Sequence, residues 1–201
     1  VEAVVKRLEA EAASVGNDAV RLRQLAALAE ELSHSTLAER LYRQAAEREP
    51  RFLIDLVRFL VRAKQVSAAF EVCQSAWSRL PAETAAPLAL SLLAFPEGRA
   101  EHLRPLEVKL IKAVEQNAKS MSLQTNLADL RCWQERYDEA EELYRRVLSR
   151  EPNHAAAANN LAWLLALRQH DLDDASQLIG KLIEQHGPNP QLLDTRGCVY
   201  L

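Results

Sequence analysis

The sequence has few of the residues that interrupt helices and few of those that mark other folds. Among its 201 residues are only five Gly and eight Pro, and it lacks the runs of Val, Ile and Thr in period two that are typical of strands. No stretch approaches the roughly 18 uncharged apolar residues of a membrane-spanning helix, so membrane insertion is not expected. Because 48% of the residues are apolar, the chain can bury a sizeable core. These features predict an all-α fold.

Cysteine and net charge are also scarce. Cys73, Cys132 and Cys198 are odd in number and widely separated, which argues against a disulfide framework and against a zinc cluster. We interpret each as a small buried apolar side chain. The net charge of -3 and the pI near 6.0 provide no overall field that would attract a phosphate backbone. Nucleic acid is therefore not an expected partner.

Residue patterns for catalysis, cofactor binding and metal binding are missing. The sequence has no Gly-rich phosphate loop and no G-x-S-x-G motif. No two histidines are spaced as a ligand pair on one helix face. All five lie in expected turns, at expected helix ends or near an irregular loop: His34, His102, His154, His170 and His186. We therefore predict that the protein is not an enzyme and has no cofactor and no metal site.

What the sequence does contain is a repeat of about 34 residues, marked by small residues and proline. Residues 121–152 carry it most clearly, with helices expected at Ser122–Glu135 and Tyr137–Arg150. Larger side chains at the small positions would push crossing helices apart at a cost of about 1 to 3 kcal/mol. The marked positions there are Leu127, Ala128, Ala140, Tyr144, Leu148 and Pro152. They recur as Leu22, Leu25, Ala26, Ala38, Tyr42, Ala45 and Pro50, as Leu53, Leu56, Ala69, Ala76 and Pro81, and in part as Ala162.

The repeat divides the chain into successive helix pairs. The pair at 82–120 is degenerate, because Phe95 to Gly98 breaks the chain where a short turn belongs and Pro105 lies in or near the following helix. No low-complexity linker separates the pairs, so we expect one elongated array over residues 1–201. The expected boundaries are 1–16 for a helix of a preceding unit or a cap, 19–50, 51–81, 82–120, 121–152 and 153–189 for the repeats, and 190–201 for the start of a further repeat.

These positions resemble the tetratricopeptide repeat over residues 19–201. In that family, small residues recur at the eighth, twentieth and twenty-seventh places, an aromatic residue at the twenty-fourth and proline at the thirty-second. The resemblance implies a right-handed α-α superhelix of about five antiparallel helix pairs, with a protein or an extended peptide bound in its concave groove. An RNA-reading pentatricopeptide array has the same helix-pair shape, but it is expected to be basic, and this chain is not.

By the same resemblance, the first helix of each repeat lines the groove. The fourth repeat then presents Asn126, Asp129 and Trp133, and the fifth presents Asn159, Asn160 and Trp163. Asn126 and Asn160 occupy the same place in their repeats, so they predict an asparagine ladder that pairs with a peptide backbone. The alternative is that these asparagines form hydrogen bonds within the repeats or face solvent. The two tryptophans are predicted anchors for an apolar ligand side chain, or else they pack between repeats.

The first two repeats present a mildly basic part of the groove. Arg23, Arg58 and Arg62 are its predicted contact residues for a carboxylate or a phosphate. The alternative is internal pairing with neighbouring acidic residues such as Glu30 and Asp55.

We therefore expect a protein-interaction scaffold that binds a peptide or protein partner in its groove. Two alternatives remain open on the sequence. In the first, terminal helices stack on another copy and form a homo-oligomer. In the second, the chain is a regulatory or docking segment of a larger enzyme.

Overall fold

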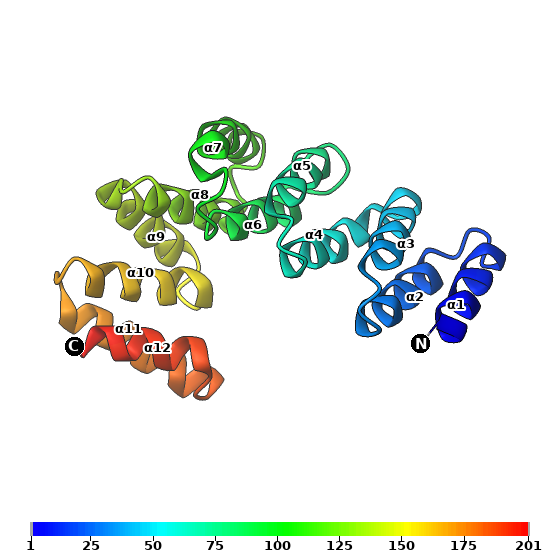
Figure 1. The fold of residues 1–201 in the computed structure, drawn as a ribbon. Coiled ribbons are helices and arrows are strands. Elements are labelled where there is room, and N and C mark those ends of the chain that lie inside the picture. The colour runs from blue at the N-terminus through cyan, green and yellow to red at the C-terminus, as the bar shows by residue number, and fades with distance from the viewer. Residues whose placement is uncertain (1, 201) are drawn as a thin grey trace. The chain divides into compact units, whose positions relative to one another are not determined.

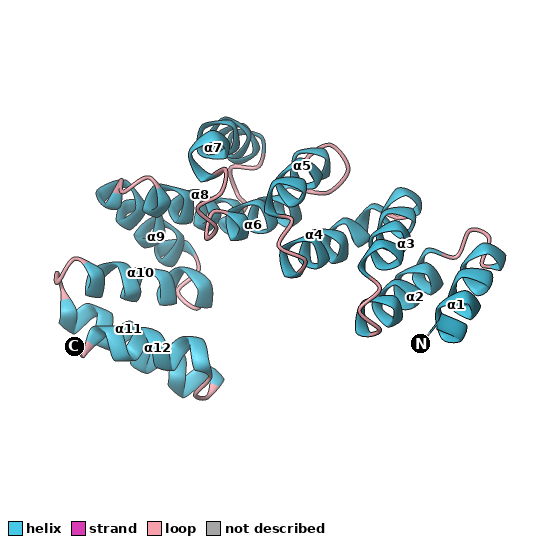
Figure 2. Cartoon of the chain, in the orientation of Figure 1, coloured by secondary structure: helices cyan, strands magenta, loops and turns pink. Residues whose placement is uncertain are grey.

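The computed structural model describes residues 2–200, so Val1 and Leu201, which the predicted boundaries include, lie outside the described residues. The described residues form α-helices and one short 3-10 helix, and none of them is in a strand (Figures 1 and 2), which confirms the all-α prediction. The helices are α1 (Glu2–Ser14), α2 (Ala19–Glu31), α3 (Ser35–Arg48), η1 (Pro50–Phe52), α4 (Leu53–Arg62), α5 (Val66–Ala76), α6 (Ala82–Leu92), α7 (Arg99–Gln116), α8 (Met121–Trp133), α9 (Tyr137–Arg150), α10 (Ala155–Leu167), α11 (Leu172–His186) and α12 (Pro190–Val199).

The chain divides into two compact units, of which the first ends at His102 and the second begins at Leu103, inside α7. The first unit contains α1 to α6 and the first turn of α7. The second contains the rest of α7 and α8 to α12. The prediction of a single array over the whole chain stays a prediction, and the two units are described separately.

In the first unit, α2 pairs with α3 and α4 pairs with α5, while α3 also packs on α4 and α5 on α6. The predicted small residues Ala26, Ala38 and Ala69 are fully buried. Asp18 begins α2, where its carboxylate accepts a hydrogen bond from the Arg21 N–H at 2.9 Å. Repeated small residues therefore pack the helices closely, as the sequence predicts.

The turn inside four helix pairs has one common form. Ser33, Lys64, Glu135 and Gln169 each follow the first helix with a φ between 50° and 60°. In each turn, the next residue donates its N–H to a carbonyl in the last turn of the preceding helix, at 2.8 to 3.0 Å. This arrangement satisfies carbonyls that the helix end leaves without partners. It makes the two helices of each pair antiparallel neighbours.

The third helix pair departs from the others. Pro87 and Pro105 lie inside α6 and α7, where each removes a backbone donor. Between these helices Gly98 adopts a φ of 77°, and a Cβ there would lie 3.2 Å from the His102 ring. That ring stacks on Phe70 with centroids 4.0 Å apart. Gly98 therefore allows both the left-handed backbone and the close approach of His102.

In the second unit, α8 pairs with α9 and α10 pairs with α11, and α12 packs on both α10 and α11. Ala128, Ala140 and Ala162 are fully buried, and Tyr144 is 1% exposed. The predicted helix Tyr137–Arg150 coincides with α9. This unit has the clearer repeat in the sequence and follows the predicted helix bounds closely.

Two further findings concern features that the sequence analysis addressed. The expectation that all three cysteines are buried is wrong for Cys198, which is exposed, whereas Cys73 is buried and Cys132 is partly buried. Among residues 2–200, none of the helices has both the length and the apolar composition needed to cross a bilayer.

Candidate functional site

The predicted contact residues of the fourth and fifth repeats lie on α8 and α10. We call the surface formed by Asn126, Asp129, Trp133, Asn159, Asn160 and Trp163 the α8–α10 surface. Its two helices meet where the Asn160 Nδ2 donates a hydrogen bond to the Asp129 Oδ1 at 2.8 Å. The structure thus brings side chains from two neighbouring first helices together.

The two asparagines of the predicted ladder differ in their surroundings. Asn126 is 7% exposed, and its Nδ2 is buried without a hydrogen-bond partner among the residues that the structure describes. Asn160 is only partly buried, and it donates to Asp129 and accepts a 3.2 Å hydrogen bond from the Asn159 Nδ2. Asn159 is 6% exposed, and its Oδ1 is likewise buried with no partner within residues 2–200. Asn160 therefore takes part in bonding between repeats, while Asn126 and Asn159 each keep one unpaired group.

Asp129 is the acceptor that joins three helices. Besides the bond from Asn160, it accepts a 2.6 Å hydrogen bond from the Tyr144 hydroxyl on α9. Burial raises the pKa of Asp129 above its usual range, and the two hydrogen bonds act in the opposite direction. Burial also raises the pKa of Tyr144 well above its ordinary value and that of nearby Cys132 to about 11. Asp129 therefore holds the repeats together, and its bonds to Tyr144 and Asn160 occupy one of its oxygens.

Trp133 and Trp163 provide the apolar part of this surface. Trp133 is 37% exposed and Trp163 is 38% exposed. Trp133 lies four residues after Asp129 on α8, and Trp163 lies three residues after Asn160 on α10, so each indole is about one helical turn beyond the contact between the helices. The surface thus combines exposed aromatic area with buried amide groups.

In the first unit, two of the three predicted arginines are paired between α2 and α4. Arg23 donates to the Asp55 Oδ1 at 3.1 and 3.0 Å. Arg62 donates to the two carboxylate oxygens of Glu30 at 2.7 and 2.9 Å, a bidentate contact. Internal pairing, the alternative that the sequence left open, is thus what the structure has for these two residues.

The Glu30 carboxylate also accepts a 3.0 Å hydrogen bond from the Tyr42 hydroxyl. The hydrogen bond from Arg62 lowers the pKa of Glu30. Burial, together with the bond to Glu30, raises the pKa of Tyr42 to about 12. These contacts tie α2, α3 and α4 together.

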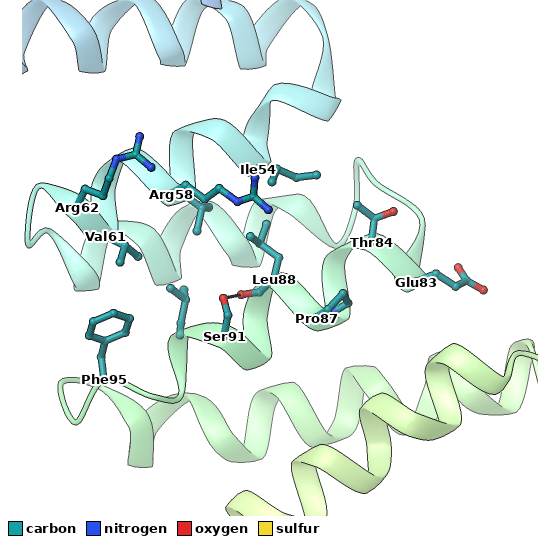
Figure 3. A pocket seen from close by; sticks show the side chains of 12 residues that line it. Ile54, Arg58, Val61, Arg62, Glu83, Thr84, Pro87, Leu88, Ser91 and Phe95 are labelled. Atoms are coloured by element: carbon teal, nitrogen blue, oxygen red, sulfur yellow. Dashed lines mark hydrogen bonds between the residues drawn. The ribbon is translucent and has the colours of Figure 1, made fainter. Parts of the chain in front are cut away.

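Arg58 differs from Arg23 and Arg62. It is exposed and forms no ion pair or hydrogen bond with any residue between 2 and 200. It lines a cavity of about 680 Å³ between α4 and α6 in the first unit (Figure 3). We call this cavity the α4–α6 groove; its lining residues are Ile54, Val57, Arg58, Val61, Arg62, Glu83, Thr84, Pro87, Leu88, Ser91, Leu92 and Phe95.

The sequence analysis assigned Arg58 and Arg62 to a groove but did not find the α6 side of this one. The repeat pattern is weakest over residues 82–120, so no first-helix positions could be assigned there. The feature of the sequence that could have indicated this groove is Pro87, together with the short side chains around it. A proline and small residues facing a neighbouring helix leave space that larger side chains would fill.

A cluster of possible metal ligands lies between α9 and the residues just before α11. Ligand atoms of Glu141, His170 and Asp171 lie within 4.8 Å of one another. Glu141 forms ion pairs with Arg145 at 3.0 Å and Arg168 at 3.1 Å, and Asp171 lies 3.6 Å from Arg145. These ion pairs account for the position of the carboxylates without a metal.

Helix pairs of this form, packed through small residues, define a class of α-helical repeat protein. Residues 119–184 match the sequence model of the family described as Tetratricopeptide repeat. The predicted resemblance is therefore confirmed: this segment consists of tetratricopeptide repeats, and the helices of the whole chain fit about five such units.

Solved structures of tetratricopeptide repeat proteins have the same fold. A thermophilic protein of this kind from Thermus thermophilus has a TM-score of 0.65 at 19% identity, over 91% of this chain and 100% of its own. Another, from Parabacteroides merdae, has a TM-score of 0.71 at 17% identity, over 96% of this chain and 77% of its own.

A third is YrrB, described as a tetratricopeptide repeat protein with an unusual peptide-binding site. It has a TM-score of 0.51 at 16% identity, over 94% of this chain and 97% of its own. No protein with a curated description matches the chain.

Proposed function

We propose that this chain is a protein-interaction scaffold that binds an extended peptide of a partner protein on the α8–α10 surface. Tetratricopeptide repeats are typically non-enzymatic scaffolds, which supports the general class. The observation that carries the proposal is the pair of indoles, each more than one-third exposed, beside amides that keep unpaired groups. Burying aromatic side chains of this kind dominates the energetics of many interfaces.

The amides supply backbone recognition in this proposal. The Asn126 Nδ2 is a donor for a peptide carbonyl, and the Asn159 Oδ1 is an acceptor for a peptide N–H. Both atoms are buried, so a small rotation of the side chains accompanies binding. Because leaving such groups unpaired costs about 1–3 kcal/mol each, a ligand that pairs them gains affinity. The peptide-binding site named for YrrB, which has the same fold, is consistent with this mode of use.

The test is a selection of phage-displayed random peptides on the whole chain, followed by measurement of Kd for the best synthetic peptide. Replacing Trp133 and Trp163 together by alanine is expected to weaken binding at least about tenfold. Val108→Ala is the matched control, because Val108 is 63% exposed on α7 and lies outside this surface. Equal affinity for the wild type and the double variant would contradict the proposed site.

The asparagines are tested separately with Asn126→Ala and Asn159→Ala. If the amides pair with the peptide backbone, each change weakens peptides of unrelated sequence by a similar factor. Asn160→Ala is expected instead to reduce stability, since Asn160 bonds to Asp129. Unchanged affinity in Asn126→Ala and Asn159→Ala would remove the ladder from the proposal while leaving the tryptophan anchors.

Self-association is a second candidate function. Leu193 on α12 and Tyr200, which follows this helix, are both exposed and offer apolar area for contact with another copy. A mass in solution that increases with concentration, and that returns to the monomer value in Leu193→Ser, would support it. A role as the docking segment of a larger enzyme is examined by the same peptide selection, because the selected sequences reveal what kind of segment the chain recognises.

A further inference from the structure

Three of the residues that α6 contributes to the α4–α6 groove have short side chains. On α6 the lining includes the short side chains of Thr84, Pro87 and Ser91, with the longer Leu88 between Pro87 and Ser91 (Figure 3). Pro87 also removes the helical hydrogen bond that residue 87 would donate to the Glu83 carbonyl. Because these side chains are too short to fill the space opposite α4, a cavity of about 680 Å³ remains. Its volume falls within the roughly 300–1,000 Å³ of ligand pockets in proteins.

The wall of the groove is mainly apolar. Val57 and Leu92 are almost fully buried, and Ile54, Val61 and Phe95 are partly buried. Ser91, near the end of α6, directs its hydroxyl to the Leu88 carbonyl at 2.7 Å, as the dashed line in Figure 3 shows. The groove is thus suited to an apolar side chain.

The α4 side of the groove carries an unpaired positive charge, Arg58. Arg62 is already paired with Glu30, but Arg58 is not paired with any acidic residue of the described chain. Figure 3 shows its guanidinium near Ile54, beside the apolar wall. Glu83, the acidic residue of the lining, forms no ion pair with it. An apolar wall excludes water from one side of the guanidinium, which strengthens its attraction for a carboxylate.

We propose that the α4–α6 groove binds an acidic amphipathic segment of a partner protein. One large apolar side chain of the segment enters between α4 and α6, and a neighbouring Asp or Glu carboxylate pairs with Arg58. Charge complementarity selects this occupant: a single unpaired guanidinium beside apolar residues matches one carboxylate next to one apolar side chain. The inference rests on the proposed function as a peptide-binding scaffold and adds a second site with a stated ligand chemistry.

The probe is again a phage-displayed random peptide library, now selected in parallel on the wild type and on Ser91→Trp, whose indole is expected to obstruct the groove. Peptides enriched on the wild type alone are expected to carry a large apolar residue within about one helical turn of an Asp or Glu. Their Kd is expected to rise at least about tenfold in Arg58→Gln and to recover in part in Arg58→Lys, which restores the charge without the bidentate geometry. Added salt should weaken the wild type more than Arg58→Gln.

Arg48→Gln is the matched control, because Arg48 is an exposed arginine on α3, outside the groove. If Ser91→Trp fails to fold, Arg58→Gln replaces it as the variant for the parallel selection. Arg58→Gln is expected to fold, since it changes an exposed side chain that has no partner in the described structure. Peptides without an acidic preference, or an affinity within about twofold of wild type in Arg58→Gln, overturn the inference.

The outcome for this groove is distinguishable from that for the α8–α10 surface. Peptides that need Trp133 and Trp163 but tolerate Ser91→Trp and Arg58→Gln would leave the proposed function standing and remove this second site. Peptides that need Arg58 but not the two tryptophans would support the α4–α6 groove and remove the α8–α10 surface as the peptide site. A library that yields no binding peptide overturns both.

Discussion

Tyr42 and Tyr144 occupy the same place in the second helices of their repeats, one in each unit of the molecule. Each donates its hydroxyl to a carboxylate on the first helix of its own repeat, Glu30 at 3.0 Å and Asp129 at 2.6 Å. Each carboxylate also accepts from the first helix of the following repeat. In the first unit that donor is the guanidinium of Arg62, and in the second it is the amide of Asn160.

The difference between these two donors changes the chemistry of the link. Arg62 is charged and more than half exposed, and its hydrogen bond lowers the pKa of Glu30. The amide of Asn160 brings no charge, and burial raises the pKa of Asp129. The same tyrosine place thus bonds to the carboxylate of an exposed ion pair in one unit and, in the other, to a partly buried carboxylate whose second donor is a neutral amide. The small and large residues of the repeat set the packing, while the polar residues that link repeats differ between the two units.

The largest effect is expected from Asp129→Ala. The change leaves both the Tyr144 hydroxyl and the Asn160 amide without their acceptor in a closely packed region. Since each unsatisfied buried group costs about 1–3 kcal/mol, the free energy of unfolding should fall by about 2–4 kcal/mol. Urea unfolding followed by tryptophan fluorescence measures it, because Trp133 and Trp163 both lie in this unit. A loss below about 1 kcal/mol would mean that the buried link is no stronger than the exposed one.

The sequence predicts the packing of these repeats better than their polar links. The buried alanines Ala128, Ala140 and Ala162 follow from spacing alone, because a close helix crossing accepts only a small side chain. Spacing also places Asp129 and Asn160 on first helices. It does not reveal that they bond to each other, since this depends on the rotation between adjacent repeats.

The groove residues illustrate the same limit. The sequence assigns Arg23, Arg58 and Arg62 to one basic surface, but the acidic partners of Arg23 and Arg62 lie on different helices about one repeat away. Which arginine remains unpaired is therefore a property of the packed helices. The α6 wall escapes prediction because Pro87 lies in the repeat where the pattern is lost.

A second, smaller effect separates the charge of Asp129 from its hydrogen bonds. In Asp129→Asn, the new Oδ1 can still accept from both Tyr144 and Asn160, which bond to the same oxygen in the wild type. The pKa of Asp129 is higher in the folded state than in the unfolded state. The stability that protonated Asp129 contributes is therefore fully present below the unfolded pKa of about 3.9 and is lost as pH rises through the folded pKa. The stability of Asp129→Asn relative to wild type should therefore increase from about pH 4 to pH 7. Urea unfolding of both proteins across this range checks it, and a difference independent of pH would show that Asp129 has an ordinary pKa.

The smallest effect, and the one that should have the opposite pH dependence, is expected from Glu30→Gln. The pKa of Glu30 is lowered in the folded state, so its contribution is present above the unfolded pKa of about 4.3 and is lost as pH falls through the folded pKa. Because the ion pair with Arg62 is exposed, the cost at pH 7 should be about 0.5–1 kcal/mol. This loss of stability should be smaller below pH 4, and it should also be smaller when NaCl is raised from about 0.05 to 0.5 M. Trp77, the tryptophan of the first unit, reports this transition by fluorescence in a Trp133→Phe/Trp163→Phe background. Asp129→Asn is expected to become more stable relative to the wild type as the pH rises. If Glu30→Gln did the same, the two tyrosine-linked carboxylates would be equivalent, and the proposed difference between the units would be wrong.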